Sequence, residues 1–220
     1  IPGMPTLTDE QKEQGEKEMK VMEAIISSMT PEERAAIPGD YSIDENWLGR
    51  VKAVVDYAID EGMYVIINVH HEQWVNRSDF AIAYESISPE LKAVWRQIAY
   101  YFEDYDQHLI FEGMNEPRIS YGQESEWTTD DPAVFEVINR LNADFVETVR
   151  SVDSPYQYTR LLMIPGYAAS ADKSIYEKVI IPGGNDKNGD GYDDYVAISI
   201  HAYKPFDFAL GNGNHSVFSH

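Results

Sequence analysis

The dipeptide Asn115-Glu116 stands where a short apolar run ends, and its side chains are suited to acid–base chemistry. The run Leu109–Phe111, within LIFEGMNEP, is typical of a parallel strand that is covered on both faces. In β/α proteins, ligands bind at the carboxyl ends of such strands. A Glu116 carboxyl group seated there could serve as a general acid, and Asn115 could bind a substrate hydroxyl. A turn that only ends the strand is the alternative.

Three other apolar runs end in a comparable way. They are Tyr64–Val69, followed by His70, His71 and Glu72; Leu161–Ile164, followed by Pro165, Gly166 and Tyr167; and Val196–Ile200, followed by His201, Ala202 and Tyr203. Because the carboxyl ends of parallel strands meet at one edge of a sheet, these imidazole, phenol and carboxyl groups are predicted to share a site with Glu116.

In these four segments the sequence resembles the family-5 glycoside hydrolases, a group of (β/α)8-barrel enzymes that contains many cellulases. The matching text is YVIINVHHEQW, LIFEGMNEPR, RLLMIPGY and YVAISIHAY, in the family's order. The resemblance covers roughly Tyr41 to Phe208. It implies an endo-β-1,4-glucanase whose partner is a β-glucan; mannan, xyloglucan or mixed-linkage glucan are alternative substrates, and a non-catalytic glycan-binding fragment is the alternative outside enzymes.

The resemblance also implies roles for individual residues. Retaining glycosidases use two carboxyl groups, one as acid/base and one as nucleophile. By resemblance Glu116 is the acid/base and Asn115 contacts the sugar hydroxyl beside the anomeric centre. His70 matches the histidine of the third barrel strand, and His201 and Tyr203 match the pair of the sixth. The nucleophilic glutamate of the seventh strand and the stacking tryptophan of the eighth have no counterpart in this sequence, so the isolated chain is expected to have little activity.

Several neighbouring residues allow two interpretations. His70 and His201 could be core histidines, and His71 could bind substrate or only brace the site. Trp74 and Trp127 could stack on sugar rings or pack loops against the scaffold. A metal at His70-His71-Glu72 is disfavoured, because adjacent strand residues face opposite ways. We expect no cofactor.

The segment Asp186–Gly191 resembles the start of a calcium loop. Asp186, Asn188 and Asp190 alternate before a glycine, and Asp194 occupies the ninth place. The twelfth place, however, is Ala197 rather than the bidentate glutamate. A weak calcium site and a solvated turn are therefore both open.

The elements that must position these residues follow a β/α rhythm. Ser42 and Asp131 are predicted to cap helices, Ser88-Pro89 to open another, and Gly62 to end the first. The expected apolar stripes are Leu48, Val51, Val54, Val55 and Ile59; Leu91, Val94, Trp95, Ile98 and Phe102; and Phe135, Ile138, Leu141, Phe145 and Val149. A weaker helix is expected near Ala171–Val179.

Four strands that alternate with helices predict a parallel sheet with outer helices. By resemblance, these are the third to sixth strands of a barrel. Residues 41–220 would thus form a partial (β/α)8 TIM barrel, preceded by an acidic helical segment or insertion at residues 1–40.

The composition limits the kinds of partner that the chain can bind. The 220 residues include 38 acidic and 17 basic side chains, a formal net charge of −21, which argues against binding nucleic acid or anionic membranes. A neutral glycan fits this charge. There are no cysteines, so disulfides and thiolate metal sites are excluded. No signal peptide or 18-residue apolar segment appears, and a secreted location is inferred from the resemblance alone. Because a half barrel exposes strand edges, we expect self-association or association with the missing barrel half.

Overall fold

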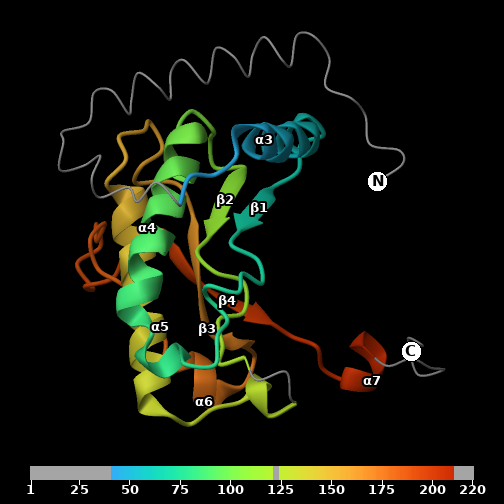
Figure 1. Cartoon of the computed structure of the whole chain (residues 1–220). Coiled ribbons are helices and arrows are strands. Elements are labelled where there is room, and N and C mark those ends of the chain that lie inside the picture. The colour runs from blue at the N-terminus through green and yellow to red at the C-terminus, as the bar shows by residue number, and fades with distance from the viewer. Residues whose placement is uncertain (1–40, 121–123, 211–220) are drawn as a thin grey trace, which may run out of the picture.

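The computed structural model describes residues 41–120 and 124–210, and a four-stranded parallel sheet forms the centre of this part of the chain. The strands are β1 (Val65–Asn68), β2 (Leu109–Glu112), β3 (Leu162–Ser170) and β4 (Val196–His201), and they lie side by side in that order. All three neighbouring pairs are parallel, as the alternation of strands and helices predicts (Figure 1). The predicted boundary at residue 40 and the predicted helical segment 1–40 lie outside the described residues.

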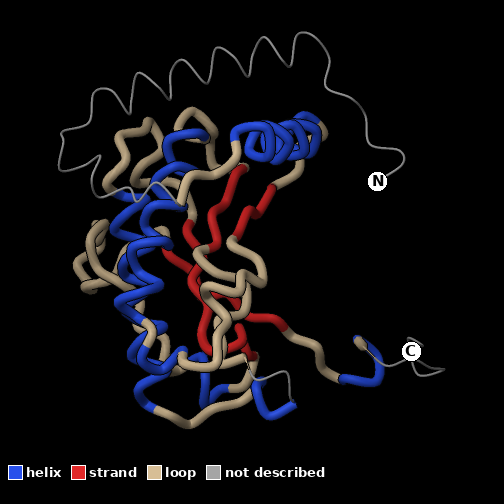
Figure 2. Tube along the Cα trace, in the orientation of Figure 1, coloured by secondary structure: helices blue, strands red, loops and turns tan. Residues whose placement is uncertain are grey.

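Two long helices, α4 (Tyr84–Tyr101) and α5 (Pro132–Arg150), run along one face of the sheet (Figures 1 and 2). The remaining helices are α3 (Glu45–Asp60), the short α6 (Lys173–Tyr176) and α7 (Phe206–Ala209), and the 3-10 turns η1 (Phe80–Ile82) and η2 (Glu124–Trp127). In the described ranges, none of the helices is long and apolar enough to cross a membrane.

The helix boundaries follow from capping chemistry, with two corrections. Asp131 caps α5 by accepting the Ala133 N–H at 2.9 Å, as predicted. For α3, however, the cap is Asp44 and not Ser42, because the Asp44 carboxylate accepts the Trp47 N–H at 2.8 Å. The helix α4 begins at Tyr84 and includes Pro89, so Ser88-Pro89 does not open it.

The predicted apolar stripes belong to the hydrophobic core or pack against it, except for Val54 of α3, which is 65% exposed. The best-packed part of the core joins Trp95 of α4 to Phe111 of β2 and Phe145 of α5, with ring centroids 5.4 and 4.7 Å from that of Trp95. The indole N–H of Trp95 donates to the backbone oxygen of Gly113 at 2.8 Å. This bond ties the core to the chain segment just after β2.

The strand β3 is longer than the sequence suggests. Pro165, Gly166 and Tyr167 were predicted to follow the strand, but they lie inside it. Its pairing with β4 shifts register between Pro165 and Ser170, and Ala168 and Ala169 have φ values of 51° and 45°. Pro165 is tolerated inside the strand because the regular pairing of β3 with β2 ends at Met163, before the proline. The irregular stretch between Pro165 and Ser170 follows it.

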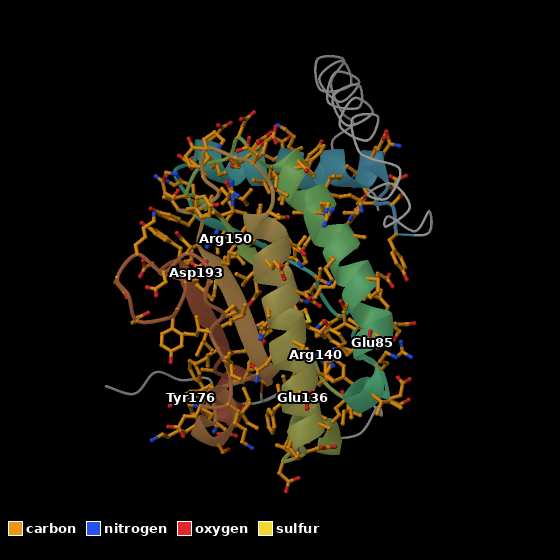
Figure 3. The ribbon with its side chains drawn as sticks, turned by 90° about the vertical axis from the view of Figure 1, so that its left-hand side faces the viewer. Glu85, Glu136, Arg140, Arg150, Tyr176 and Asp193 are labelled. Atoms are coloured by element: carbon orange, nitrogen blue, oxygen red, sulfur yellow. The ribbon has the colours of Figure 1, made fainter. Side chains whose placement is uncertain are left out.

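An ion pair fastens α5 to the loop that precedes β4. The Arg150 guanidinium contacts the two carboxylate oxygens of Asp193 at 2.9 and 3.1 Å, and the Asp193 side chain is fully buried. Figure 3 shows the two residues close to each other at one end of α5. Arg150 also donates to the backbone oxygens of Gln157, Arg160 and Tyr195. These contacts attach the loop before β4 to the end of α5.

Candidate active site

Polar side chains on three strands meet near the carboxyl end of the sheet, and Glu112 lies at their centre. Asn68 of β1 and Glu112 of β2 are register partners, so both side chains point to the same side of the sheet. The Asn68 Nδ2 donates to Glu112 Oε2 at 2.7 Å. Ser199 of β4 donates its hydroxyl to Glu112 Oε1. Glu112 is only 4% exposed, and these hydrogen bonds give both oxygens of its buried carboxyl group a partner.

The segment after Glu112 carries Asn115 and Glu116 across the end of the sheet. It starts with Gly113, where a Cβ atom would lie 2.8 Å from the ring of Phe145, so glycine is required for this close approach. The N–H of Asn115 then donates to the Val69 oxygen at 2.9 Å. Asn115 and Glu116 are both buried, as a strand-end site requires.

Glu116 is in direct contact with His201, the last residue of β4. The His201 Nδ1 lies 2.8 Å from Glu116 Oε1, and its Nε2 lies 3.9 Å from Glu112 Oε1. One imidazole thus stands between two buried carboxyl groups. The sequence prediction that Asn115, Glu116 and His201 lie together is met by this geometry.

Arg118 supports the other side of Glu116. Its Nη1 lies 3.8 Å from Glu116 Oε2 and donates to the Glu116 backbone oxygen at 3.1 Å. Its Nε donates to Glu126 at 3.2 Å, and its guanidinium carbon lies 4.1 Å from the ring centroid of Trp127. The Tyr167 hydroxyl donates to the Glu126 backbone oxygen at 2.6 Å. These contacts join η2 and β3 to the site.

The other predicted site residues are less closely tied to Glu116. His70 and His71 are exposed, with their rings edge to face at 4.4 Å, and His71 has a φ of 53°. Tyr203 is 48% exposed and makes no hydrogen bond in the described part of the chain. Trp74 is partly buried and packs against the core, as its packing interpretation expects. Trp127 is 44% exposed. Substrate contacts for these residues stay predictions.

The loop that resembles a calcium motif is folded by its own hydrogen bonds. Asp186 accepts the N–H groups of Gly189 and Gly191 at 2.6 and 2.7 Å, and these bonds hold the pKa of its carboxyl below the usual value. Asn188 donates to Asp194 at 2.7 Å, and its own side-chain oxygen accepts the Asp190 N–H. Between residues 41 and 210, excluding 121–123, no three His, Asp or Glu side chains are arranged to hold a metal ion. Calcium binding at Asp186, Asn188 and Asp190 stays a prediction.

Four residues of this network, Asn68, Glu112, Arg118 and Ser199, were not identified from sequence. A signal was available for three of them. Asn68, Glu112 and Ser199 each interrupt an otherwise apolar strand, and a polar residue in such a run has to find a buried partner. For Arg118, the sequence offers only its position two residues after Glu116.

The chemistry open to this arrangement is proton transfer by Glu116. Its carboxyl group is buried, hydrogen-bonded to an imidazole and adjacent to an amide side chain that can bind a hydroxyl. No metal is needed for such a step. The described residues thus offer one carboxyl group that is placed for acid–base chemistry.

Comparisons with known proteins show the family of the chain. A family model described as cellulase, glycosyl hydrolase family 5, matches residues 10–218. The chain is 44% identical over 178 residues to Endoglucanase B of Ruminococcus albus, an alignment that covers 79% of this chain and 39% of that protein.

Two solved structures show the same arrangement of strands and helices. A "GH5-4 broad specificity endoglucanase" from Ruminococcus flavefaciens matches with a TM-score of 0.71 and 48% identity, over 84% of this chain and 51% of that one. The corresponding enzyme from Ruminococcus champanellensis, with bound cellotriose, matches with a TM-score of 0.70 and 39% identity, over 81% and 49%. The chain spans about half the length of these (β/α)8 barrels, which confirms the predicted fold class, a partial barrel.

Proposed function

The chain belongs to glycosyl hydrolase family 5, and we propose that the whole protein is a retaining endo-β-1,4-glucanase in which Glu116 is the acid/base. The observation that carries the assignment of Glu116 is its contact with His201 at 2.8 Å, in a buried position beside Asn115. The endoglucanases to which the chain is similar, one of them with bound cellotriose, support a β-glucan substrate.

In the proposed reaction Glu116 protonates the oxygen of the leaving sugar while a second carboxylate attacks the anomeric carbon. Water then releases the glycosyl-enzyme intermediate, with Glu116 now acting as base. Asn115 donates its amide to the neighbouring sugar hydroxyl, since its Oδ1 already accepts from Asn68 at 3.3 Å. Glu112 is not suited to be the nucleophile, because it is 4% exposed and both its oxygens accept hydrogen bonds from strand residues. We expect the nucleophile outside this chain, on the barrel strand that the family uses.

Other β-glycans are alternative substrates. Mannan, xyloglucan and mixed-linkage glucan are hydrolysed by the same reaction, and only the sugar-binding subsites of the enzymes differ. The similar enzyme from Ruminococcus flavefaciens is described as having broad specificity, which supports these polysaccharides as alternatives. A non-catalytic glycan-binding role is the alternative for the chain on its own. Because polysaccharides of this kind lie outside cells, we also propose an extracellular location.

A panel of polysaccharides tests the proposal. The full-length protein is incubated with carboxymethylcellulose, lichenan, xyloglucan and mannan, and the products are sized at early times. Rapid shortening of carboxymethylcellulose into oligosaccharides supports an endo-β-1,4-glucanase. If oligosaccharides are released only from mannan, the proposed substrate is wrong and the protein is a mannanase. If the protein binds the polysaccharides but produces no new reducing ends, it is a binding protein and not an enzyme.

A further inference from the structure

Glu112 is a buried carboxylate that the proposed reaction does not use. It closes β2, is 4% exposed and contacts no lysine or arginine among the described residues. Burying an ionised carboxylate is costly unless hydrogen bonds compensate it. A glutamate at this place therefore needs an explanation, since an apolar side chain would fill the same space at lower cost.

Its contacts lead to both residues proposed to act on the sugar. On one side, Asn68 Nδ2 donates to Glu112 Oε2 at 2.7 Å and also reaches Asn115 Oδ1 at 3.3 Å. On the other side, Glu112 Oε1 faces His201 Nε2 at 3.9 Å, while His201 Nδ1 contacts Glu116 at 2.8 Å. Glu112 thus touches the two side chains that hold Asn115 and Glu116.

The position of Glu112 bears on the protons of His201. Glu112 Oε1 accepts from Ser199 and lies 3.9 Å from His201 Nε2. At this distance a carboxylate attracts a proton on Nε2 and repels the lone pair of an unprotonated Nε2. With a proton on Nε2, the only other proton of the pair lies between His201 Nδ1 and Glu116 Oε1. That shared proton is the one available to the leaving group, whichever of the two atoms holds it at rest.

We propose that Glu112 is a positioning residue that keeps a proton on His201 Nε2, so that Nδ1 and Glu116 share the proton Glu116 delivers. This role rests on the proposed glycosidase function. Through Asn68, the same carboxylate turns the Asn115 amide group outward to meet the sugar. The Arg118 guanidinium is a further charged group beside Glu116, with its Nη1 3.8 Å from Glu116 Oε2.

Nitrogen NMR of the full-length protein, labelled with 15N-histidine, tests the assignment directly. Protonated and unprotonated ring nitrogens have well-separated chemical shifts, and the His201 signals are those missing from His201→Gln. In the wild type at neutral pH we expect Nε2 to be protonated. An unprotonated Nε2 in the folded wild type would overturn the proposal without requiring any variant of Glu112.

Two matched variants test whether Glu112 is the group that keeps the proton on His201 Nε2. In Glu112→Gln the new amide can donate to Nε2, so Nε2 is expected to release its proton to solvent. The proton shared with Glu116 then stays on Nδ1, because a neutral imidazole carries one N–H. In Ser199→Ala the carboxylate remains and the Nε2 proton should stay. Nε2 that remains protonated in a folded Glu112→Gln protein would show that Glu112 does not set it.

Kinetics then separate this role from a structural one. In Glu112→Gln, kcat on substrates with poor leaving groups should fall by up to about 10²-fold, which is less than the loss expected when the acid itself is removed. KM should change little, and kcat on aryl glycosides with good leaving groups should be nearly unaffected. An equal loss on both substrate types would indicate a merely structural glutamate and overturn the proposal. An inactive wild type with a protonated Nε2 would contradict the proposed function but leave the assignment of Glu112 as the group that keeps this proton in place.

Discussion

At the scale of single residues, Glu116 is held between an imidazole and a guanidinium. His201 contacts one of its oxygens at 2.8 Å and Arg118 lies 3.8 Å from the other, so its carboxyl group has one orientation. The rest of the Glu116 side chain is buried, with 7% of the residue exposed. Acid catalysis needs a carboxyl group fixed in this way, since proton transfer depends on distance.

The variant Glu116→Gln tests this role in the full-length protein. Activity on substrates with poor leaving groups should fall by on the order of 10²–10⁴-fold, because the amide cannot donate a proton, while activated aryl glycosides should lose much less. Initial rates on a cellobioside pair with good and poor leaving groups measure the difference. Similar losses on both, in a protein that unfolds at the wild-type temperature, would remove Glu116 from the acid/base role.

The sequence predicted the residues of this network that follow the strands better than those that lie inside them. Asn115, Glu116 and His201 follow apolar runs, and the motif context identified them. Asn68, Glu112 and Ser199 lie inside strands, and the partner of each is on a neighbouring strand, so their pairing depends on register. Register between distant strands is set by the whole fold and cannot be seen in one segment.

At the scale of elements, the ion pair Arg150–Asp193 carries the connection between α5 and β4. We predict that Asp193→Asn lowers the free energy of unfolding by about 3–5 kcal/mol, because it leaves a buried guanidinium without its carboxylate. Urea unfolding followed by circular dichroism measures the change.

A surface pair provides the control for that measurement. Lys173 of α6 and Glu177, the residue that follows this helix, are 3.3 Å apart, and both side chains are more than half exposed. The variant Glu177→Gln should therefore change the free energy of unfolding by less than about 0.5 kcal/mol. A loss for Asp193→Asn as small as that of Glu177→Gln would mean that packing, and not the ion pair, holds the loop.

The contact between α3 and the loop before β2 should be sensitive to alkali. Burial, together with the hydrogen bond that Tyr105 donates to Asp56, raises the pKa of the Tyr105 phenol to about 12. Since the folded value lies above the unfolded value of about 10, this stabilisation is complete below pH 10 and is lost as the pH rises through 12. We predict that the melting temperature of the wild type falls more steeply over this range than that of Tyr105→Phe.

The exposed Tyr57 of α3 supplies the matched variant. It is 54% exposed, so Tyr57→Phe should retain the wild-type slope between pH 10 and 12. Parallel curves for wild type and Tyr105→Phe would show that Tyr105 does not contribute to the alkaline loss.

Element boundaries were predictable where a cap or a glycine is unambiguous and less so elsewhere. Asp131-Pro132 and Gly62 fit their predicted roles, and Gly62 has a φ of 76°. Ser42 and Asp44 are both good caps, and only the geometry of the entering chain selects Asp44. The length of β3 depends on its pairing with β4 beyond Pro165, which the local sequence does not reveal.

At the scale of the whole molecule, the described sheet has two edges, β1 and β4. Helices α4 and α5 lie together on one face of this sheet (Figure 2). Large apolar side chains on the edge strands are about half exposed, with Ile66 of β1 at 51% and Ile200 of β4 at 44%. Unpaired parallel edges with apolar side chains favour association with further strands.

We therefore predict that the 220-residue chain on its own self-associates and has little or no glycosidase activity. The formal charge of −21 opposes contact between copies, and salt screens this repulsion, so the mean mass from light scattering should rise with NaCl above the 25.1 kDa of one chain. Ile66→Lys should reduce the association, because it places a charge on the edge strand. The matched change Ile82→Lys, on an 83% exposed side chain of η1 outside the sheet, should not. A mass of 25.1 kDa at every salt and protein concentration, together with ordinary hydrolysis of carboxymethylcellulose, would mean that this chain closes its own sheet and contains its own second carboxylate.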